Sequence, residues 1–457
     1  MADAKRGAAT PVDATPQARA PTGEFRRGWR TLLLALAGAA TTVSVTLLYG
    51  FGTLVLPLQQ AFGWSRADLQ IASSCMSGGV VVASQLAGWL NQRYGMRRVT
   101  LLSLAVLPLA FFALTAVRGS IGWLYLGFFI VPIVGVGVTF VSWTQLVSAW
   151  FDRQRGLALA LVLCGSGFAA ALLPPMLSWA IGRWDWRAGF VLLGLLPLLL
   201  TLPLALRFLR PSPQAALASC APPSAPTPAP TPSSRAQRLE IAGKADAGKT
   251  PVSPPADGSD DLRATLRSSK FWTLNIALTL VVSAVVGMVT NTIPLLRDLG
   301  LSATQASAIF GSFGVALIGG RLLAGWLIDR LWAPGVAAVA LALPSIGCLL
   351  LWQASATSSP ALLTLAVALV GVGAGAEFDL SAYLVARYFG LRHYGHLFGI
   401  HLGLITAGGM LAPLMFAAMY RATGGYAPML AYCAASCVVG PLLLLTLGKQ
   451  PGVGSVE

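Results

Sequence analysis

Long apolar runs separated by short polar connections dominate the chain from residue 31 onward. A helix that crosses the hydrocarbon core of a bilayer needs about 20 mostly apolar residues, and the runs reach that length. The pattern therefore predicts an all-α integral membrane protein. We predict twelve transmembrane helices, at 31–58, 67–90, 99–118, 121–148, 156–181, 188–208, 271–295, 304–328, 335–354, 360–386, 396–419 and 427–447.

Polar stretches divide these runs into two groups of six. The stretch between the sixth and seventh runs is rich in Ala, Pro, Ser and Thr, so it cannot bury a core and is typical of a disordered linker. The predicted domains are a disordered tail (1–28), a first six-helix half (29–210), the linker (211–268), a second six-helix half (269–448) and a tail (449–457).

The two halves repeat each other. The segment LPLQQAFGWS at 56–65 recurs as IPLLRDLGLS at 293–302. At the same offset, AGWLNQR at 87–93 recurs as AGWLIDR at 324–330. An internal repeat in a chain as apolar as this one is typical of secondary transporters, which work by rocking two similar halves about a central site. The repeat predicts two pseudo-symmetric six-helix halves.

Composition and charge fit a membrane protein better than a soluble one. The chain is 56% hydrophobic and only 10% charged, whereas soluble proteins average about 25% charged residues. The net charge of +15 comes from short clusters between the apolar runs, so we do not expect a nucleic-acid partner. Placing both termini in the cytoplasm puts roughly four times as many Lys and Arg on the cytoplasmic side as outside. We therefore expect a multi-pass protein of the cell inner membrane.

The connection after the second span carries a recognisable motif. Residues 88–98, GWLNQRYGMRR, resemble the G-x-L-x-D-R-x-G-R-R loop of the major facilitator superfamily, and 325–330, GWLIDR, is its second copy. Where the family has Asp, the first copy has Gln92 and the second keeps Asp329. The resemblance implies that Asp329 and Arg93 act in a cytoplasmic gate, although the arginine can also simply fix the topology.

Other segments resemble one branch of that family. The first is the end of the first span, 51–58, together with residues 62–66 that follow it. The second is the connection at 150–160, and the third is the tenth span and its end, at 375–380 and 386–390. Together they look like bacterial members of the monocarboxylate transporter and oxalate/formate exchanger branch. That resemblance implies transport of a small organic anion, often together with a proton.

Three positions depart from the branch and argue against copying its specificity. Animal monocarboxylate transporters have a lysine where this chain has Thr53, and an aspartate where it has Leu317. The oxalate exchanger has a lysine where spacing places Ile405. The identity of the anion is therefore left open.

Three full charges lie well inside predicted spans: Arg321, Glu377 and Asp379. A charge at membrane depth costs about 2.5–3.5 kcal/mol on insertion scales, so it persists mainly when paired or functional. Arg321 can bind a carboxylate with two parallel hydrogen bonds. The family resemblance implies a substrate-binding arginine at this place; the alternative is a structural ion pair with an acid of the tenth span.

Glu377 and Asp379 are expected to have different surroundings, because two residues span about 200° around a helix. Burial disfavours the charged form of a carboxyl, which suits a group that carries a proton. One of the two acids is expected to carry the coupling proton while the other pairs with a cytoplasmic arginine such as Arg387. The alternative is that both acids belong to the gate.

Polar residues in other spans complete the predicted site. Tyr49 lies one helical turn from Thr53, so both face the same side. We predict an anion site formed by Arg321 with Tyr49, Thr53 and Asn291. His401 is a candidate for anion binding or proton relay. For each of these polar groups, an ordinary hydrogen bond between helices is the alternative.

The predicted function is secondary active transport of a small, monocarboxylate-like organic anion by proton symport. An anion exchanger is the alternative, followed by a transporter-fold sensor or a drug effluxer. No nucleotide-binding loop, nucleophile triad or metal-ligand spacing occurs in the sequence, so we expect no catalytic residue, no metal, no cofactor and no enzyme activity. The lipid bilayer is the expected environment and a monomer the expected state.

Overall fold

The computed structural model describes residues 23–148, 150–151, 155–209, 265–328, 330–389 and 394–448, and its regular structure there is helical throughout. The first half contains α1 (Gly23–Ala40), α2 (Val43–Phe62), α3 (Arg66–Tyr94), α4 (Met96–Leu114), α5 (Ile121–Val134), α6 (Phe140–Ser148), α7 (Arg155–Arg183), α8 (Trp186–Leu196) and α9 (Leu202–Phe208). The second half contains α13 (Ser269–Asp298), α14 (Ala303–Ile328), α15 (Ala333–Trp352), α16 (Pro360–Phe389), α17 (Tyr394–Thr423) and α18 (Ala427–Leu445).

Helices occupy all twelve predicted spans. Among the described residues, 11 helices are long and apolar enough to cross a membrane. The remaining span, predicted at 121–148, consists of the 14-residue α5, a 3₁₀ turn at Val136–Val138 and α6. The predicted all-α fold of two six-helix halves is therefore confirmed.

The first and sixth spans are interrupted at the same depth and bonded to each other there. Between α1 and α2, the Thr42 hydroxyl donates to the Gly38 carbonyl at 2.8 Å. The Thr41 hydroxyl lies 2.6 Å from the Thr201 hydroxyl, at the end of a π-helical turn, Pro197–Thr201, between α8 and α9. These hydroxyls donate to backbone carbonyls that a regular helix would pair with amides. The helix breaks therefore cost little free energy inside the bundle.

Two predicted domain boundaries shift. Helix α1 begins at Gly23, inside the tail predicted at 1–28, because arginines extend a helix beyond the membrane without being apolar. Residues 265–267 of the predicted linker are helical, and the Ser268 hydroxyl then caps α13 by accepting from the Phe271 amide at 3.2 Å. The rest of the linker and both outer tails lie outside the described residues.

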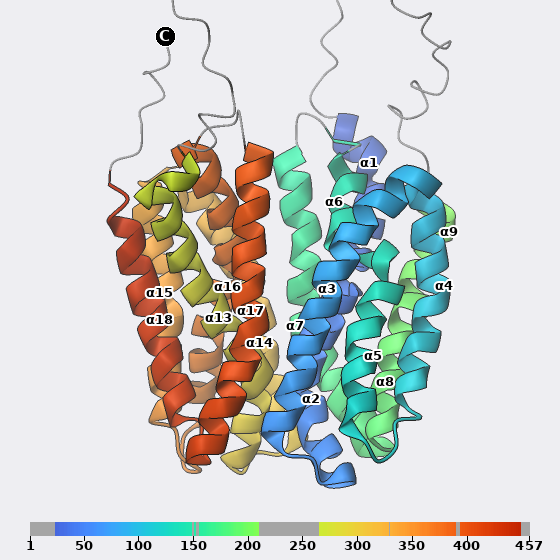
Figure 1. Cartoon of the computed structure of the whole chain (residues 1–457), viewed down its shortest axis with the longest axis vertical. Coiled ribbons are helices and arrows are strands. Elements are labelled where there is room, and N and C mark those ends of the chain that lie inside the picture. The colour runs from blue at the N-terminus through green and yellow to red at the C-terminus, as the bar shows by residue number, and fades with distance from the viewer. Residues whose placement is uncertain are drawn as a thin grey trace, which may run out of the picture.

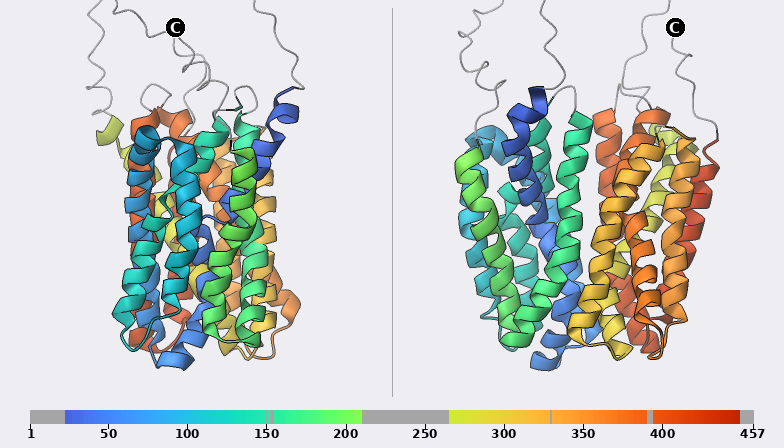
Figure 2. Two further views of the ribbon diagram at one scale, coloured as in Figure 1. Left: turned by 90° about the vertical axis from the view of Figure 1, so that its right-hand side faces the viewer. Right: turned by 180° about the vertical axis from the view of Figure 1, so that it is seen from behind.

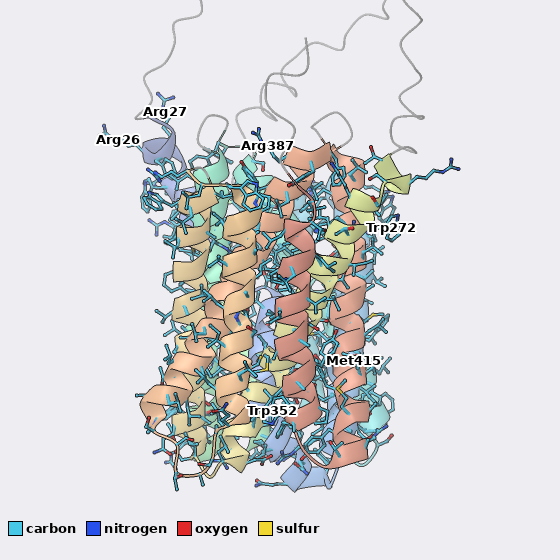
Figure 3. All side chains as sticks on the ribbon, turned by 90° about the vertical axis from the view of Figure 1, so that its left-hand side faces the viewer. Arg26, Arg27, Trp272, Trp352, Arg387 and Met415 are labelled. Carbon is cyan, nitrogen blue, oxygen red and sulfur yellow. The ribbon has the colours of Figure 1, made fainter. Side chains whose placement is uncertain are left out.

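The two halves lie side by side, with the blue-to-green helices of the first beside the yellow-to-red helices of the second (Figure 1; Figure 2). We call the end that carries Arg26, Arg27 and Arg387 the basic end (Figure 3). The opposite end, where α15 finishes at Trp352, is called the far end (Figure 3).

The halves meet along three pairs of helices: α3 with α17, α7 with α14, and α2 with α13. The α7–α14 contact depends on small residues, since a Cβ added at Gly314 would overlap the backbone of Ala171. Close approach through glycine is the usual way that membrane helices gain packing contacts. The two halves are therefore packed directly against each other.

Candidate functional site

Arg321 occupies the middle of the bundle. The helices α14 and α16 approach so closely that a Cβ at Gly320 would overlap the Val372 backbone, and one at Gly375 would overlap the Leu317 carbonyl. Gly375 is at the centre of the 30-residue α16, so Arg321, whose backbone it faces, lies at mid-depth. The Arg321 side chain is only 5% exposed.

Arg321 makes an ion pair with the acid one helical turn beyond Gly375. Its Nε lies 3.1 Å from Asp379 Oδ2. Among the described residues neither Nε nor Nη1 of Arg321 has a hydrogen-bond partner, so the Nε contact with Asp379 is an ion pair without a hydrogen bond. An unsatisfied buried donor costs about 1–3 kcal/mol, so a carboxylate that accepted from both nitrogens would bind favourably.

The two acids of α16 have different surroundings. The Asp379 side chain is 30% exposed and lies within electrostatic range of Cys164 on α7, in the other half. Glu377 is 4% exposed, and its Oε2 has no hydrogen-bond partner among the described residues. Glu377 lies within electrostatic range of Arg321 and of Cys437 on α18. Asp379 is therefore the more exposed of the two acids and lies toward α7, whereas Glu377 is buried and lies toward α18.

Tyr49 brings the first half into the same site. It is buried on α2 and its ring lies 5.8 Å from that of Phe313 on α14, across the interface. The charges of Arg321 and Glu377 both act on the Tyr49 hydroxyl. A ligand beside Arg321 would therefore contact both halves.

Thr53 and Asn291 make hydrogen bonds that do not involve Arg321 or Tyr49. The Thr53 hydroxyl donates to the Gly50 carbonyl at 2.5 Å, which leaves it engaged within α2. Asn291 accepts a hydrogen bond from Gln70 at 3.0 Å and lines a cavity with Arg66 near the far end. The structure thus brings Arg321 and Tyr49 together but does not bring Asn291 to them.

His401 lies between α17 and α13, nearer the basic end. It is fully buried, and its Nδ1 is 2.8 Å from Asn275 Oδ1. Asn275 uses its own amide nitrogen to donate to the Phe271 carbonyl at 2.8 Å, so its oxygen accepts and His401 Nδ1 carries the proton. This is the inter-helix hydrogen bond that was the alternative to a ligand role.

The predicted gate residues are at the basic end or outside the described residues. Arg93 lies in the last turn of α3, with its guanidinium 5.9 Å from the Tyr94 ring. Arg387 lies in the last turn of α16. Asp329 and the side chain of Gln92 fall outside the described residues, so the structure does not test this gate.

Sequence reasoning missed a network that joins the halves at the far end. Arg66 on α3 pairs with Asp298 at the end of α13, and Arg421 on α17 pairs with Asp68 on α3. Arg66 also donates to the Tyr426 hydroxyl at 2.7 Å. Charges at span ends look solvated in a sequence, and only their spatial pairing shows that each half supplies one cation and one acid.

The cavity beneath this network is nearly closed. It is lined by Arg66, Gln70, Asn291 and Tyr426 and has a volume of about 10 Å³. That is room for about one water molecule. The halves are therefore in contact at the far end, while Asp379, about 15 Å from the basic end of α16, remains partly exposed.

Comparison with known proteins identifies the family. The family model described as Major Facilitator Superfamily matches residues 31–413 and 276–456. The chain belongs to the Major Facilitator Superfamily. Members of this superfamily are transporters rather than enzymes, in agreement with the sequence prediction.

Individual superfamily relatives cover most of the chain. Monocarboxylate transporter 11 of Mus musculus is 25% identical over 94% of this chain and 90% of its own length. The gallate transporter of Pseudomonas putida is 28% identical over 81% of this chain and 86% of its own length. The predicted resemblance to monocarboxylate transporters is thereby confirmed.

A solved structure supports the superfamily fold independently. The crystal structure of a D-xylose-proton symporter matches with a TM-score of 0.68 and 14% identity, over 92% of this chain and 98% of that one. At this identity the match shows the fold alone. The two halves around Arg321 and Tyr49 are thus the two halves of a Major Facilitator Superfamily transporter.

Proposed function

We propose that this chain transports a small, monocarboxylate-like organic anion across the cytoplasmic membrane together with a proton, by alternating access. The observation that carries the proposal is the buried Arg321 guanidinium, which lies at mid-depth and has two nitrogens without a hydrogen-bond partner among the described residues. A planar guanidinium matches the two oxygens of a carboxylate. The names of the monocarboxylate and gallate transporter relatives agree with a carboxylate substrate.

Charge balance supports coupling to a proton. In the structure Arg321 is next to two carboxyls, Asp379 and Glu377. A substrate carboxylate adds one more negative charge to a site at membrane depth, where an uncompensated charge is costly. A proton taken up by one of the two acids with each anion keeps the site's charge constant. Proton symport follows from this balance.

Orientation follows from the basic end. Arg26, Arg27 and Arg387 all lie there, and Lys and Arg are retained preferentially on the cytoplasmic side of a membrane. The basic end is therefore assigned to the cytoplasm and the far end to the outside. The ion pairs that join the halves at the far end support the assignment of this conformation to a cytoplasm-facing state of the proposed cycle.

Transport assays in proteoliposomes test the function. We expect labelled small carboxylates to accumulate when a proton gradient is imposed, and the accumulation to collapse when a protonophore is added. An exchanger would instead show counterflow between loaded anions without any response to the gradient. Uncharged amide analogues serve as the control, and accumulation of these amides equal to that of the carboxylates would contradict the proposal.

Weakening the far-end network is expected to open that end. The double substitution Asp68→Asn with Asp298→Asn removes both ion pairs between halves. Partly exposed pairs contribute about 0.2–1 kcal/mol each, so we expect the population open at the far end to rise about fivefold. Spin labels at Trp184→Cys and Thr357→Cys, one in each half, report the opening as a longer distance in a cysteine-free background.

A matched control separates the network from general charge effects. Asp185 pairs with Arg187 at the same end, but both belong to the first half. The Asp185→Asn variant should keep the wild-type distance distribution. An equal shift from this variant, or no shift from the double variant, would refute the gate.

A further inference from the structure

A second cavity opens at the basic end, where the start of α1 meets the end of α9. It has a volume of about 280 Å³ and is lined by Trp29, Arg30, Arg207 and Phe208. Unlike the closed cavity at the far end, it is large enough for a small charged group. It lies wholly within the first half, so it is distinct from the site around Arg321.

Aromatic rings hold both arginines of this cavity. The Arg30 guanidinium carbon lies 5.5 Å from the Trp29 ring and 5.9 Å from the Phe208 ring. Arg207 lies 5.9 Å from the same Phe208 ring, and the Trp29 and Phe208 rings are 6.4 Å apart. Stacking on a ring uses the face of a guanidinium and leaves its N–H edge available for an anion.

No carboxylate of the described residues forms an ion pair with Arg30 or Arg207. Two positive charges lie here without a counter-ion in the part of the chain that the structure describes, which is unfavourable unless an anion or solvent compensates them. A phosphate group, which accepts bidentate hydrogen bonds from arginine, suits this arrangement.

The surroundings of the cavity are apolar on the membrane side. Leu33, one turn beyond Trp29 on α1, is 41% exposed, and Leu206 on α9 is 59% exposed. Trp29 itself is half exposed, as expected of a tryptophan at a membrane–water interface. A ligand with an anionic head and apolar chains would match both parts of this surface.

We propose that this cavity binds the headgroup of an anionic phospholipid from the adjacent leaflet. The phosphodiester accepts hydrogen bonds from Arg30 and Arg207, the Trp29 and Phe208 rings flank the headgroup, and the acyl chains lie along Leu33 and Leu206. Basic pockets among transmembrane helices at the cytoplasmic side are suited to such headgroups. Because α1 begins the first span and α9 ends the sixth, the bound lipid joins the two ends of the first half.

Native mass spectrometry of the full chain in detergent tests the site. The protein is mixed with equal amounts of dioleoylphosphatidylglycerol and dioleoylphosphatidylcholine, and in a separate arm with inorganic phosphate. We expect retention of phosphatidylglycerol over phosphatidylcholine. We also expect phosphatidylglycerol, but not inorganic phosphate, to raise the melting temperature of the protein.

Charge-matched variants locate the binding. The Arg30→Gln and Arg207→Gln double variant should retain phosphatidylglycerol at least tenfold less well than the wild type. The Arg26→Gln and Arg27→Gln variant removes the same number of charges one turn away, outside the cavity, and should retain it as the wild type does. Should the cavity variant not fold, retention is compared for Trp29→Ala against Trp272→Ala, a half-exposed tryptophan on α13.

Three outcomes would overturn the proposal. Equal loss in the two arginine variants would mean diffuse attraction to charge rather than a site. The same thermal shift with inorganic phosphate would mean an anion site that ignores the lipid. Equal retention of both lipids by the wild type would mean no anionic headgroup preference.

Discussion

Replacing Arg321 with alanine is expected to abolish carboxylate transport and to weaken carboxylate binding at least about 100-fold. Two charge-assisted hydrogen bonds to the substrate would be lost, each contributing about 1.5–3 kcal/mol. The donors in question are Nε and Nη1 of Arg321, which have no hydrogen-bond partner among the described residues. Thermal-shift titration with a panel of small carboxylates measures the binding, and proteoliposome uptake measures the transport.

Removing Arg321 also leaves Asp379 without its ion-pair partner, so the design needs controls for folding. The double variant Arg321→Ala with Asp379→Asn restores charge balance, and it should fold yet bind no better. Arg321→Lys keeps the charge but loses the planar pair of donors, and should retain weak binding. If Arg321→Ala, folded and monodisperse, bound carboxylates as the wild type does, the site would have to lie elsewhere.

The fold was predictable because membrane spans are long and apolar. Each predicted run corresponds to helix, and the duplicated segments correspond to the two halves. The breaks within spans were not predicted, because they depend on hydroxyl contacts such as Thr41 with Thr201, which are far apart in the chain. The start of α1 at Gly23 was missed for a different reason: hydropathy indicates the membrane boundary, not the end of the helix.

The cluster of buried charges at the centre of the candidate site was predictable from the cost of burying charge. Arg321, Glu377 and Asp379 stand out in a sequence because few charges occur inside spans. The depth of each polar residue in the membrane was harder to predict. Asn291, for example, accepts a hydrogen bond from Gln70 in a layer nearer the far end than Arg321. A polar residue in a span indicates that its side chain has a hydrogen-bond partner. Which residue is that partner depends on how the two halves pack. The far-end ion pairs were missed for the same reason.

The two acids differ in a way that predicts which one couples the proton. Asp379 is partly exposed and paired with Arg321, so its charge is compensated in the absence of substrate. Glu377 is almost fully buried, and no described residue forms a hydrogen bond with its Oε2. An ionised carboxylate there is costly unless Arg321 compensates it, so substrate binding to Arg321 and proton binding to Glu377 favour each other. We therefore propose that Glu377 carries the coupling proton. Asp379 then takes back Arg321 as its ion-pair partner once the substrate has left.

Glu377→Gln is accordingly expected to uncouple transport from the proton gradient. Gradient-driven accumulation should be lost, whereas counterflow of labelled substrate between equal anion pools should persist, because glutamine permanently mimics the neutral acid. Asp379→Asn should instead bind carboxylate more tightly, since Arg321 loses its competing partner, and release it more slowly. Asp185→Asn, an acid outside the site, is the control and should behave as the wild type in both assays. Gradient-driven accumulation that survived in both Glu377→Gln and Asp379→Asn would show that neither acid carries the proton.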